Sequence, residues 1–315
     1  MRYLLLVLLF FSVSSGGFVN ADSADRRELI KSSNRVVFLG DSITYSGAYV
    51  ANFIAWAELE FPKKKIDWIN VGLSSETVSG LSEKGHAGGR FPRPDLFERL
   101  DRVLQQTKPD LVFACYGMNC GIYLPQDQDR FAKYKQGITK LKQEVEKTGA
   151  KIVFLTPPYF DKMRNAKKSY YTDVLAAYSN WLVDQRKNGW MVADVNRAMT
   201  KAIEKNRESD PKYSVQRDAV HPDKTGHWMM AQPLIRWFGD DESAKKTSVE
   251  DMLKLRGKHV KIFQLCNQRM SVLRDAWLTK TGHKRPGVRK GKPLQEAKLE
   301  AEGLTKEIEK LKSLE

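Results

Sequence analysis

The chain is poor in cysteine, with only Cys115, Cys120 and Cys266 among 315 residues. An odd number of cysteines cannot pair completely, and no two of them have the spacing of a CxxC motif or a zinc finger. These features argue against a disulfide-rich scaffold, a structural zinc site and a dithiol redox centre. The cysteines therefore give no reason to expect a metal or redox site.

Long hydrophobic runs are also scarce, and the one apolar run of note lies at the N-terminus. It extends from Tyr3 to Val13 behind the basic Arg2, which suits a signal peptide and is too short for a comfortable membrane span. Small residues at Val19 and Ala21 predict cleavage after Ala21. The sequence thus predicts a signal peptide over residues 1–21 and a secreted or periplasmic protein. An uncleaved N-terminal anchor is the alternative.

Acidic residues are in the minority, since 53 Lys and Arg residues face 38 Asp and Glu, for a formal net charge of +15. Such a balance favours contact with anionic surfaces but does not specify a fold. The chain has no zinc-finger spacing and no RNP-type aromatic motif, so we expect no specific nucleic-acid partner. Hydrophobic residues make up 41%, which is enough for a sizeable core.

Five short apolar runs predict β-strands. Most are continuous rather than alternating, as in strands that a parallel sheet buries on both faces. Helical periodicity separates them, and this alternation predicts a three-layer α/β/α sandwich around a five-stranded parallel sheet. The predicted strands are Arg35–Gly40, Ile66–Gly72, Asp110–Gly117, Lys151–Thr156 and Trp190–Val195; the predicted helices are Ala48–Glu60, Asp95–Gln106, Phe131–Lys147, Thr172–Lys187 and Thr225–Phe238.

The sequence predicts a body over residues 22–241 and a helical, basic C-terminal extension over residues 242–315. Helical periodicity resumes from Ser248 to about Thr281, and the Lys-, Arg-, Gly- and Pro-rich segment His283–Pro293 indicates a solvated linker. The last stretch, Leu294–Glu315, predicts a charged helix. It would either be a solvated tail packed loosely on the domain or contact a partner or an anionic surface.

Ser42 is the candidate nucleophile, because it follows the first predicted strand in the run Gly40-Asp41-Ser42-Ile43-Thr44. Ligand sites of open α/β sheets lie at the carboxyl ends of the strands. A serine at the start of a helix there exposes its hydroxyl, and its own N–H can face a developing anion. The alternative is an ordinary Asp-Ser helix cap.

Asp218 and His221 are the candidate relay, within Asp218-Ala219-Val220-His221-Pro222 ahead of the last body helix. Their spacing allows the carboxylate to orient the imidazole and to stabilise its protonated form. A nucleophilic serine needs such a base. Taken alone, the motif would also fit a turn-forming Asp and a surface His.

The two strand ends between these motifs supply candidate oxyanion donors. Gly72 closes the second strand, and Asn119 lies in Gly117-Met118-Asn119 after the third. The Gly72 N–H, the Asn119 amide and the Ser42 N–H would form a three-donor hole. Ordinary turn chemistry is the alternative, but all the motifs fall in order along one predicted rim of the sheet.

These blocks together resemble the SGNH (GDSL-type) hydrolase superfamily, whose conserved positions supply Ser, Gly, Asn and His. The resemblance extends from Val36 to Phe238 and implies a flavodoxin-like fold and a cofactor-free serine esterase. The runs at Phe91–Asp95, Thr156–Tyr159, Arg274–Thr279 and Gly282–Pro286 are similar to an exported subgroup common in bacteria that degrade complex polysaccharides. This likeness implies removal of O-acetyl groups from carbohydrates. A lipid or aryl esterase and a non-catalytic carbohydrate-binding protein are the alternatives.

The third block departs from the family pattern, because Cys120 stands where an Asp usually follows the Asn. The donor Asn119 is retained, but its orientation loses a support, and Cys120 itself could be read as a nucleophile. Three further residues near the rim are candidate substrate contacts: His86 and Arg90 on a Gly-rich loop, and Tyr116 beside the third strand end. The alternative for His86 and Arg90 is a mobile surface loop, and the alternative for Tyr116 is packing in the core or at the rim, which is the more frequent role of such a tyrosine.

Overall fold

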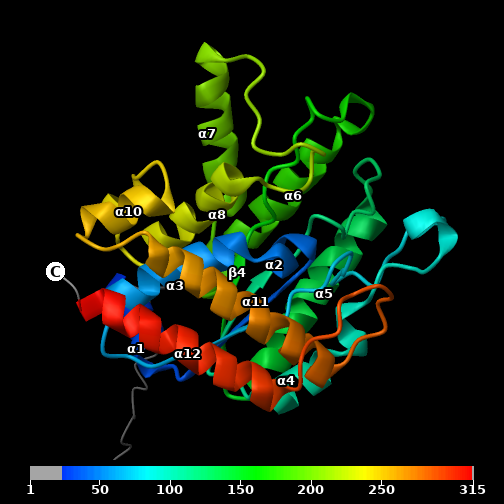
Figure 1. The fold of residues 1–315 in the computed structure, drawn as a ribbon. Coiled ribbons are helices and arrows are strands. Elements are labelled where there is room, and N and C mark those ends of the chain that lie inside the picture. The colour runs from blue at the N-terminus through cyan, green and yellow to red at the C-terminus, as the bar shows by residue number, and fades with distance from the viewer. Residues whose placement is uncertain (1–22, 314–315) are drawn as a thin grey trace, which may run out of the picture.

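The computed structural model describes residues 23–313, so the predicted signal peptide lies outside the described residues. Helices surround a central sheet (Figure 1). The sheet has five strands, all parallel, in the order β2-β1-β3-β4-β5. The strands are β1 (Arg35–Gly40), β2 (Asp67–Asn70), β3 (Leu111–Cys115), β4 (Lys151–Leu155) and β5 (Met191–Ala193). All five predicted strands are confirmed, and four of them are shorter than their apolar runs.

Helices connect the strands and agree with most of the predicted ones. The predicted helix Asp95–Gln106 instead divides at Arg99 into a 3₁₀ turn (Leu96–Glu98) and α4, and neither α1 nor α7 was predicted. The α-helices of the body are α1 (Ser23–Ser32), α2 (Ser42–Ser46), α3 (Ala48–Glu60), α4 (Leu100–Thr107), α5 (Gln128–Lys147), α6 (Tyr171–Asp184), α7 (Val195–Ser209) and α8 (Lys224–Trp237).

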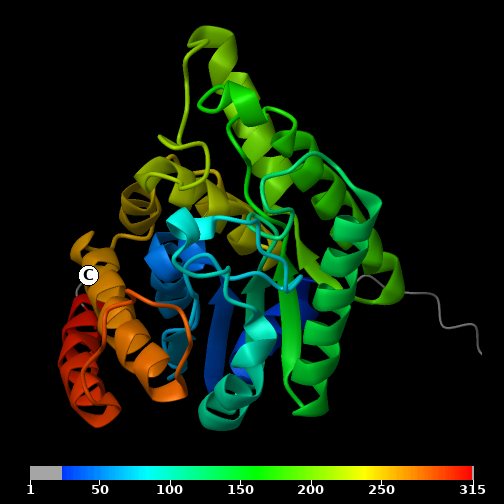
Figure 2. The same ribbon diagram turned by 90° about the vertical axis from the view of Figure 1, so that its right-hand side faces the viewer.

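The sheet carries a helical layer on each face, and the strand residues show which helices cover which face. Successive side chains of a strand point to opposite faces. Phe38 of β1 packs on Phe53 of α3, at 6.1 Å between ring centroids. Phe154 of β4 is in register with Leu39, the residue that follows Phe38 in β1. Its side chain therefore points to the opposite face of the sheet, where it stacks on Trp190. The layers of α3 with α8 and of α5 with α6 therefore cover opposite faces (Figure 2).

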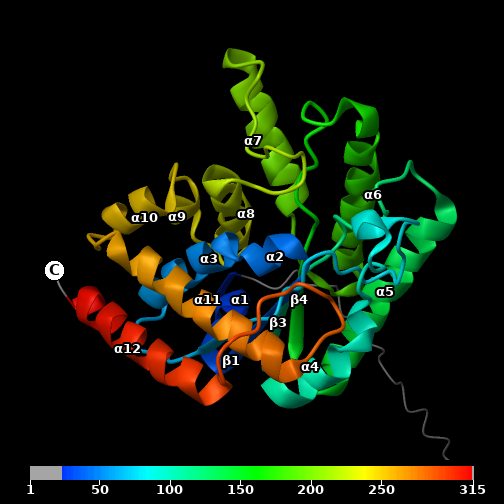
Figure 3. The same cartoon turned by 45° about the vertical axis from the view of Figure 1, so that its right-hand side comes forward.

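The C-terminal extension consists of α9 (Asp241–Ala244), α10 (Val249–Leu255), α11 (Lys261–Thr281) and α12 (Leu294–Ser313). The last two helices lie side by side (Figures 1 and 3), with α11 packed on α3 and β2 and α12 packed against α11. Glu58 of α3, which is buried, forms ion pairs with Arg269 of α11 at 2.6 Å and Lys312 of α12 at 3.0 Å. The final helix is thus packed, not loosely attached, and its buried residues are Ala297, Ala301, Leu304 and Ile308.

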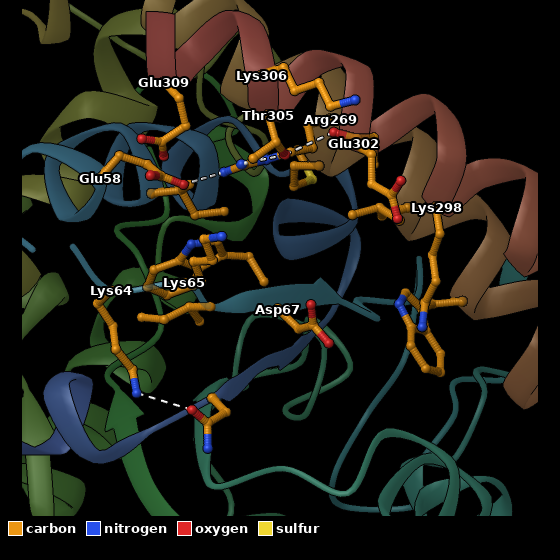
Figure 4. A pocket seen from close by; sticks show the side chains of 18 residues that line it. Glu58, Lys64, Lys65, Asp67, Arg269, Lys298, Glu302, Thr305, Lys306 and Glu309 are labelled. Carbon is orange, nitrogen blue, oxygen red and sulfur yellow. Dashed lines mark hydrogen bonds and ion pairs between the residues drawn. The ribbon is translucent and has the colours of Figure 1, made fainter. Parts of the chain in front are cut away.

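A cavity of about 810 Å³ lies where α11 and α12 meet the edge strand β2 (Figure 4). Trp68, Leu273 and Trp277 contribute apolar surface, and several Lys and Glu side chains surround them. None of the residues predicted to act in catalysis lines this cavity. Among the described residues 23–313, no helix has the length and apolar character needed to cross a membrane.

Candidate active site

The strand order brings Ser42 and Asn119 to one place, because they follow the neighbouring strands β1 and β3. The chain reverses its direction across the sheet between these strands, where open α/β sheets bind their ligands. Ser42 is the first residue of α2, whose N-cap Asp41 accepts a hydrogen bond from the Ile43 N–H at 3.0 Å. Burial raises the pKa of Asp41 to about 6.

Ser42, His221 and Asp218 form one continuous hydrogen-bonded chain. Ser42 Oγ lies 2.8 Å from His221 Nε2, and His221 Nδ1 lies 2.6 Å from Asp218 Oδ2. The backbone N–H groups of Val220 and His221 also donate to Asp218 Oδ1, at 3.0 and 2.7 Å. Although partial burial opposes it, these hydrogen bonds hold the pKa of Asp218 below its usual range. Asp218 is therefore poised as a carboxylate that fixes the His221 ring.

The loop that carries Asp218 and His221 is anchored to the segment after β4. Ala219, between them, has a left-handed backbone with φ of 71°, and its carbonyl accepts the Asp161 N–H at 2.9 Å. The Gln216 side chain donates to the carbonyls of Tyr159 and Val220, at 2.5 and 3.2 Å. A non-glycine residue rarely adopts a positive φ, and the hydrogen bonds around Ala219 hold the turn in this conformation.

Asn119 lies at the end of the loop after β3 with its amide oriented by two contacts. Its Nδ2 donates to the carbonyl of Glu76 at 3.3 Å, and its Oδ1 accepts a hydrogen bond from Tyr123 OH at 3.1 Å. An amide nitrogen carries two N–H groups. One N–H of Asn119 is thus left for a substrate oxygen. Gly117 opens this loop with φ of 145°, and a Cβ there would lie 2.7 Å from Pro157.

The expectation that Gly72 offers a free backbone donor needs correction. Its N–H donates to Asn70 Oδ1 at 2.9 Å, and a Cβ at this position would lie 2.5 Å from the Tyr45 nitrogen. Gly72 is thus required for close packing beneath α2. Ser75 of the same loop has a φ of 70° and precedes Glu76, whose carbonyl meets Asn119. The backbone N–H of Ser75 is therefore the better candidate for an oxyanion donor. The sequence analysis did not identify it, because the residue at this position is not a glycine.

Tyr116 does not face a substrate, which corrects a second expectation. Its side chain is buried, and its hydroxyl donates to Glu76 Oε2 at 2.6 Å. Glu76 also forms a fully buried ion pair with Arg99, at 2.6 Å between Oε1 and Nε. Tyr116 and Arg99 thus fix the residue whose carbonyl contacts Asn119. A buried Glu-Arg pair between separate segments leaves no local signal in the sequence.

His86 and Arg90 lie on the Gly-rich loop, and the structure gives each a protein partner. His86 Nδ1 lies 3.2 Å from Glu83 Oε1, and its ring packs edge-on against Phe91. Arg90 is exposed and donates from Nε to the carbonyl of Ala87 at 2.8 Å. Neither residue contacts Ser42, His221 or Asn119, so a role in substrate binding stays a prediction. The nearby Arg93 does approach the site, with its guanidinium 5.2 Å from the Tyr123 ring centroid.

Cys120 is buried and unsuited to nucleophilic attack. Burial is the main reason that its pKa is raised to about 12, so the thiol stays protonated at neutral pH. Hydrogen bonds from the backbone of Val78 and Ser79 oppose this shift. The Cys120 sulfur therefore lies close to these backbone N–H groups, and we interpret Cys120 as a structural residue. Within residues 23–313, no cluster of His, Cys, Asp or Glu has the arrangement of a metal site.

Comparison with known families shows which class of protein contains this site. Residues 38–229, more than half of the chain, match the GDSL-like Lipase/Acylhydrolase family. The chain belongs to this family and is a hydrolase of ester bonds. No curated protein sequence matches it significantly.

Several solved structures share the fold. A gut microbial diltiazem-metabolizing enzyme, BT4096, is 23% identical with a TM-score of 0.53, over 65% of this chain and 47% of that one. The present chain thus spans about half of that enzyme. A variant of Axe2, an acetyl-xylooligosaccharide esterase from Geobacillus stearothermophilus, is 20% identical with a TM-score of 0.51, over 65% of this chain and 94% of that one. At these identities the likeness concerns the fold.

Proposed function

We propose that the chain is a serine esterase in which Ser42 attacks the ester carbonyl and removes O-acetyl groups from a carbohydrate. The observation that carries this proposal is the unbroken chain of hydrogen bonds from Ser42 Oγ through His221 to Asp218. In this arrangement His221 Nε2 accepts the serine proton as the Oγ–carbon bond forms. Asp218 holds the ring in place and stabilises the imidazolium.

Collapse of the tetrahedral intermediate completes the first half-reaction. The sugar hydroxyl leaves with the proton from His221, and an acetyl group remains on Ser42. Water, deprotonated by the same nitrogen, then hydrolyses this acyl-enzyme and releases acetate. The free N–H of the Asn119 amide and the backbone N–H groups of Ser42 and Ser75 would donate to the oxyanion.

Two observations support a polymer-borne acetyl group as the substrate. The His221 and Asp218 side chains are 49% and 56% exposed, so a chain much larger than the ester can approach them. One protein of the same fold, Axe2, is described in its solved structures as an acetylxylan or acetyl-xylooligosaccharide esterase. Secretion, as inferred from residues 1–21, would place the enzyme where such polymers occur. A lipid or aryl esterase is the second candidate.

The test compares the wild type with Ser42→Ala on p-nitrophenyl acetate. Loss of the nucleophile should lower kcat by about 10⁴–10⁶-fold without a change in melting temperature. Activity within tenfold of wild type in a folded Ser42→Ala protein would contradict the assignment. It would leave a carbohydrate-binding role, which a glycan-binding assay with the same variant measures.

The substrate class needs a separate comparison. Acetate release from acetylated xylan should exceed hydrolysis of p-nitrophenyl laurate when rates are expressed as kcat/KM. A clear preference for the long-chain or aryl ester would support the second candidate and overturn the carbohydrate assignment, while leaving the serine mechanism intact.

A further inference from the structure

The Tyr123 hydroxyl holds the oxygen end of the Asn119 amide, whose nitrogen end meets a backbone carbonyl. The hydroxyl donates to Asn119 Oδ1 at 3.1 Å, while Asn119 Nδ2 points to the carbonyl of Glu76 at 3.3 Å. Asn119 is only 4% exposed, so water gives its oxygen little alternative. A 180° rotation of the amide would set its NH₂ group against the Tyr123 hydroxyl and its oxygen against a carbonyl. The carbonyl can only accept and therefore opposes the rotated form, and the tyrosine hydroxyl, which donates to Oδ1 in the observed form, adds to the same preference.

This orientation matters chemically because the two ends of an amide have opposite effects on an oxyanion. The N–H end stabilises the developing charge, whereas the oxygen end repels it. Without the Tyr123 hydroxyl, the buried Asn119 oxygen would lack a donor, and the penalty against the rotated form would shrink. Part of the enzyme population would then present an oxygen to the reaction centre.

The Tyr123 ring is itself held from several sides. It stacks on Tyr171 with 4.8 Å between ring centroids, and the Tyr170 hydroxyl donates to its backbone carbonyl at 3.3 Å. Two cations also lie over the ring, with the Arg93 guanidinium at 5.2 Å and the Lys168 ammonium at 5.1 Å from its centroid. These contacts come from two separate parts of the chain, Arg93 and the segment 168–171, and they hold the Tyr123 ring where its hydroxyl reaches Asn119.

The backbone at Ile122 and Tyr123 has an unfavourable conformation that brings the Tyr123 hydroxyl to Asn119. Ile122 and Tyr123 have φ values of 49° and 55°, in the left-handed region. A β-branched residue such as Ile122 seldom adopts this conformation, because its branched side chain crowds the backbone there. The tight turn brings Tyr123 back to a residue only four positions earlier. Strain of this kind persists where a site needs the resulting geometry.

We propose that Tyr123 is a positioning residue that keeps the Asn119 amide in its donating orientation, in a loop where Cys120 replaces the usual Asp. The proposal rests on the proposed function, because it assigns Asn119 to the oxyanion hole. Tyr123 acts through Asn119 and does not touch the reacting atoms. Its hydroxyl supplies the constraint that the substituted block would otherwise lack.

Tyr123→Phe tests this directly, because it removes the hydroxyl and retains the ring and its stacking partners. The expected result on p-nitrophenyl acetate is a fall in kcat of about tenfold, a fraction of the 10²–10³-fold that an oxyanion donor supplies, with KM nearly unchanged. Tyr134→Phe is the matched control. It removes a buried hydroxyl that donates to the Tyr116 carbonyl at 3.3 Å, and it should leave kcat at the wild-type value. Wild-type kcat in Tyr123→Phe would overturn the proposal.

A double-mutant cycle separates positioning from general damage. In an Asn119→Ala background the amide is gone, so Tyr123→Phe should cost nothing further. Equal losses in both backgrounds would show that Tyr123 acts elsewhere, and the proposal would fail while the oxyanion role of Asn119 stood. If Asn119→Ala alone kept wild-type kcat, the oxyanion assignment under the proposed function would itself be wrong. Melting temperatures of all four proteins would exclude unfolding as the cause.

Discussion

Arg274 of the C-terminal extension donates a hydrogen bond from Nη1 to the backbone carbonyl of Tyr45 at 2.7 Å, and its guanidinium lies 4.3 Å from the Tyr45 ring centroid. Tyr45 belongs to α2, the five-residue helix that begins at Ser42. Met270 of the same extension contacts Asn70, whose amide donates to the Thr44 carbonyl at 2.7 Å. The extension therefore supports the carboxyl end of the helix that carries the candidate nucleophile.

Arg274→Gln should weaken both the fold and the catalysis. The arginine is largely buried, and its loss removes a charge-assisted hydrogen bond and a stacking contact. We expect the free energy of unfolding to fall by about 1.5–3 kcal/mol and kcat to fall with it. Arg274→Lys should be intermediate, since an ammonium cannot form the planar fork. Urea titrations and esterase rates measure both effects.

The control for this prediction is Arg285→Gln. Arg285 also belongs to the extension and also lies over an aromatic ring, with its guanidinium 5.1 Å from the Phe91 centroid. It donates to the carbonyl of the adjacent Pro286 and has no contact with α2. Stability and kcat should stay near wild type. If the two variants behaved alike, support of α2 by Arg274 would be refuted.

Truncation after Gly282 should destabilise the protein, although the sequence alone suggested a loosely packed tail. The cut removes α12 with its buried Leu304 and Ile308, and it deprives Glu58 of Lys312. Burial of two large aliphatic side chains contributes up to about 3–6 kcal/mol. We expect a clearly lower melting temperature, with residual esterase activity in the fraction that remains folded. An unchanged melting curve would show that α12 adds nothing to the fold.

Cys120→Asp should fold and retain activity within about tenfold of wild type. The backbone N–H groups of Val78 and Ser79 already face the sulfur, and a carboxylate would accept their hydrogen bonds. Kinetics with p-nitrophenyl acetate and a thermal melt decide the outcome. Cys120→Ala should also be active, because the thiol has no chemical part in the reaction. An inactive but folded Cys120→Ala protein would reopen the question of a cysteine nucleophile.

His227 should make the fold sensitive to mild acid. Burial lowers its pKa to about 4 from the usual 6.5. Below pH 6.5 the unfolded chain binds a proton that the folded chain does not, so stability falls as the pH drops towards 4. At pH 5 the loss amounts to about 2 kcal/mol relative to pH 8.

His227→Gln should reduce this loss, and urea midpoints at pH 8 and pH 5 provide the measurement. The matched control is His259→Gln, which removes an exposed histidine of the extension and should keep the pH response of the wild type. If His227→Gln and the wild type lost stability equally between the two pH values, the titration of another group would be responsible.

Much of the architecture could be predicted from the sequence because the signals were local. A buried parallel strand needs an unbroken apolar run, so Arg35–Gly40 and Lys151–Thr156 were recognisable without their neighbours. Asp218 and His221 are three residues apart, and that spacing alone lets one turn join them. The sequence also placed Ser42 and Asn119 at strand ends, and parallel strands bring such ends to the same rim.

Only the tertiary structure decided which groups at that rim are free to act. Gly72 and Tyr116 have suitable chemistry and lie close to the rim in sequence, yet the first donates to Asn70 and the second to Glu76. Their partners come from the packing of loops, which no spacing rule specifies. The same holds for Tyr123 and Arg274, which reach Asn119 and α2 through contacts between segments that have no common motif. Sequence determined the candidate reacting groups through local pattern, whereas their orientation and support depend on long-range contacts that exist only in the folded chain.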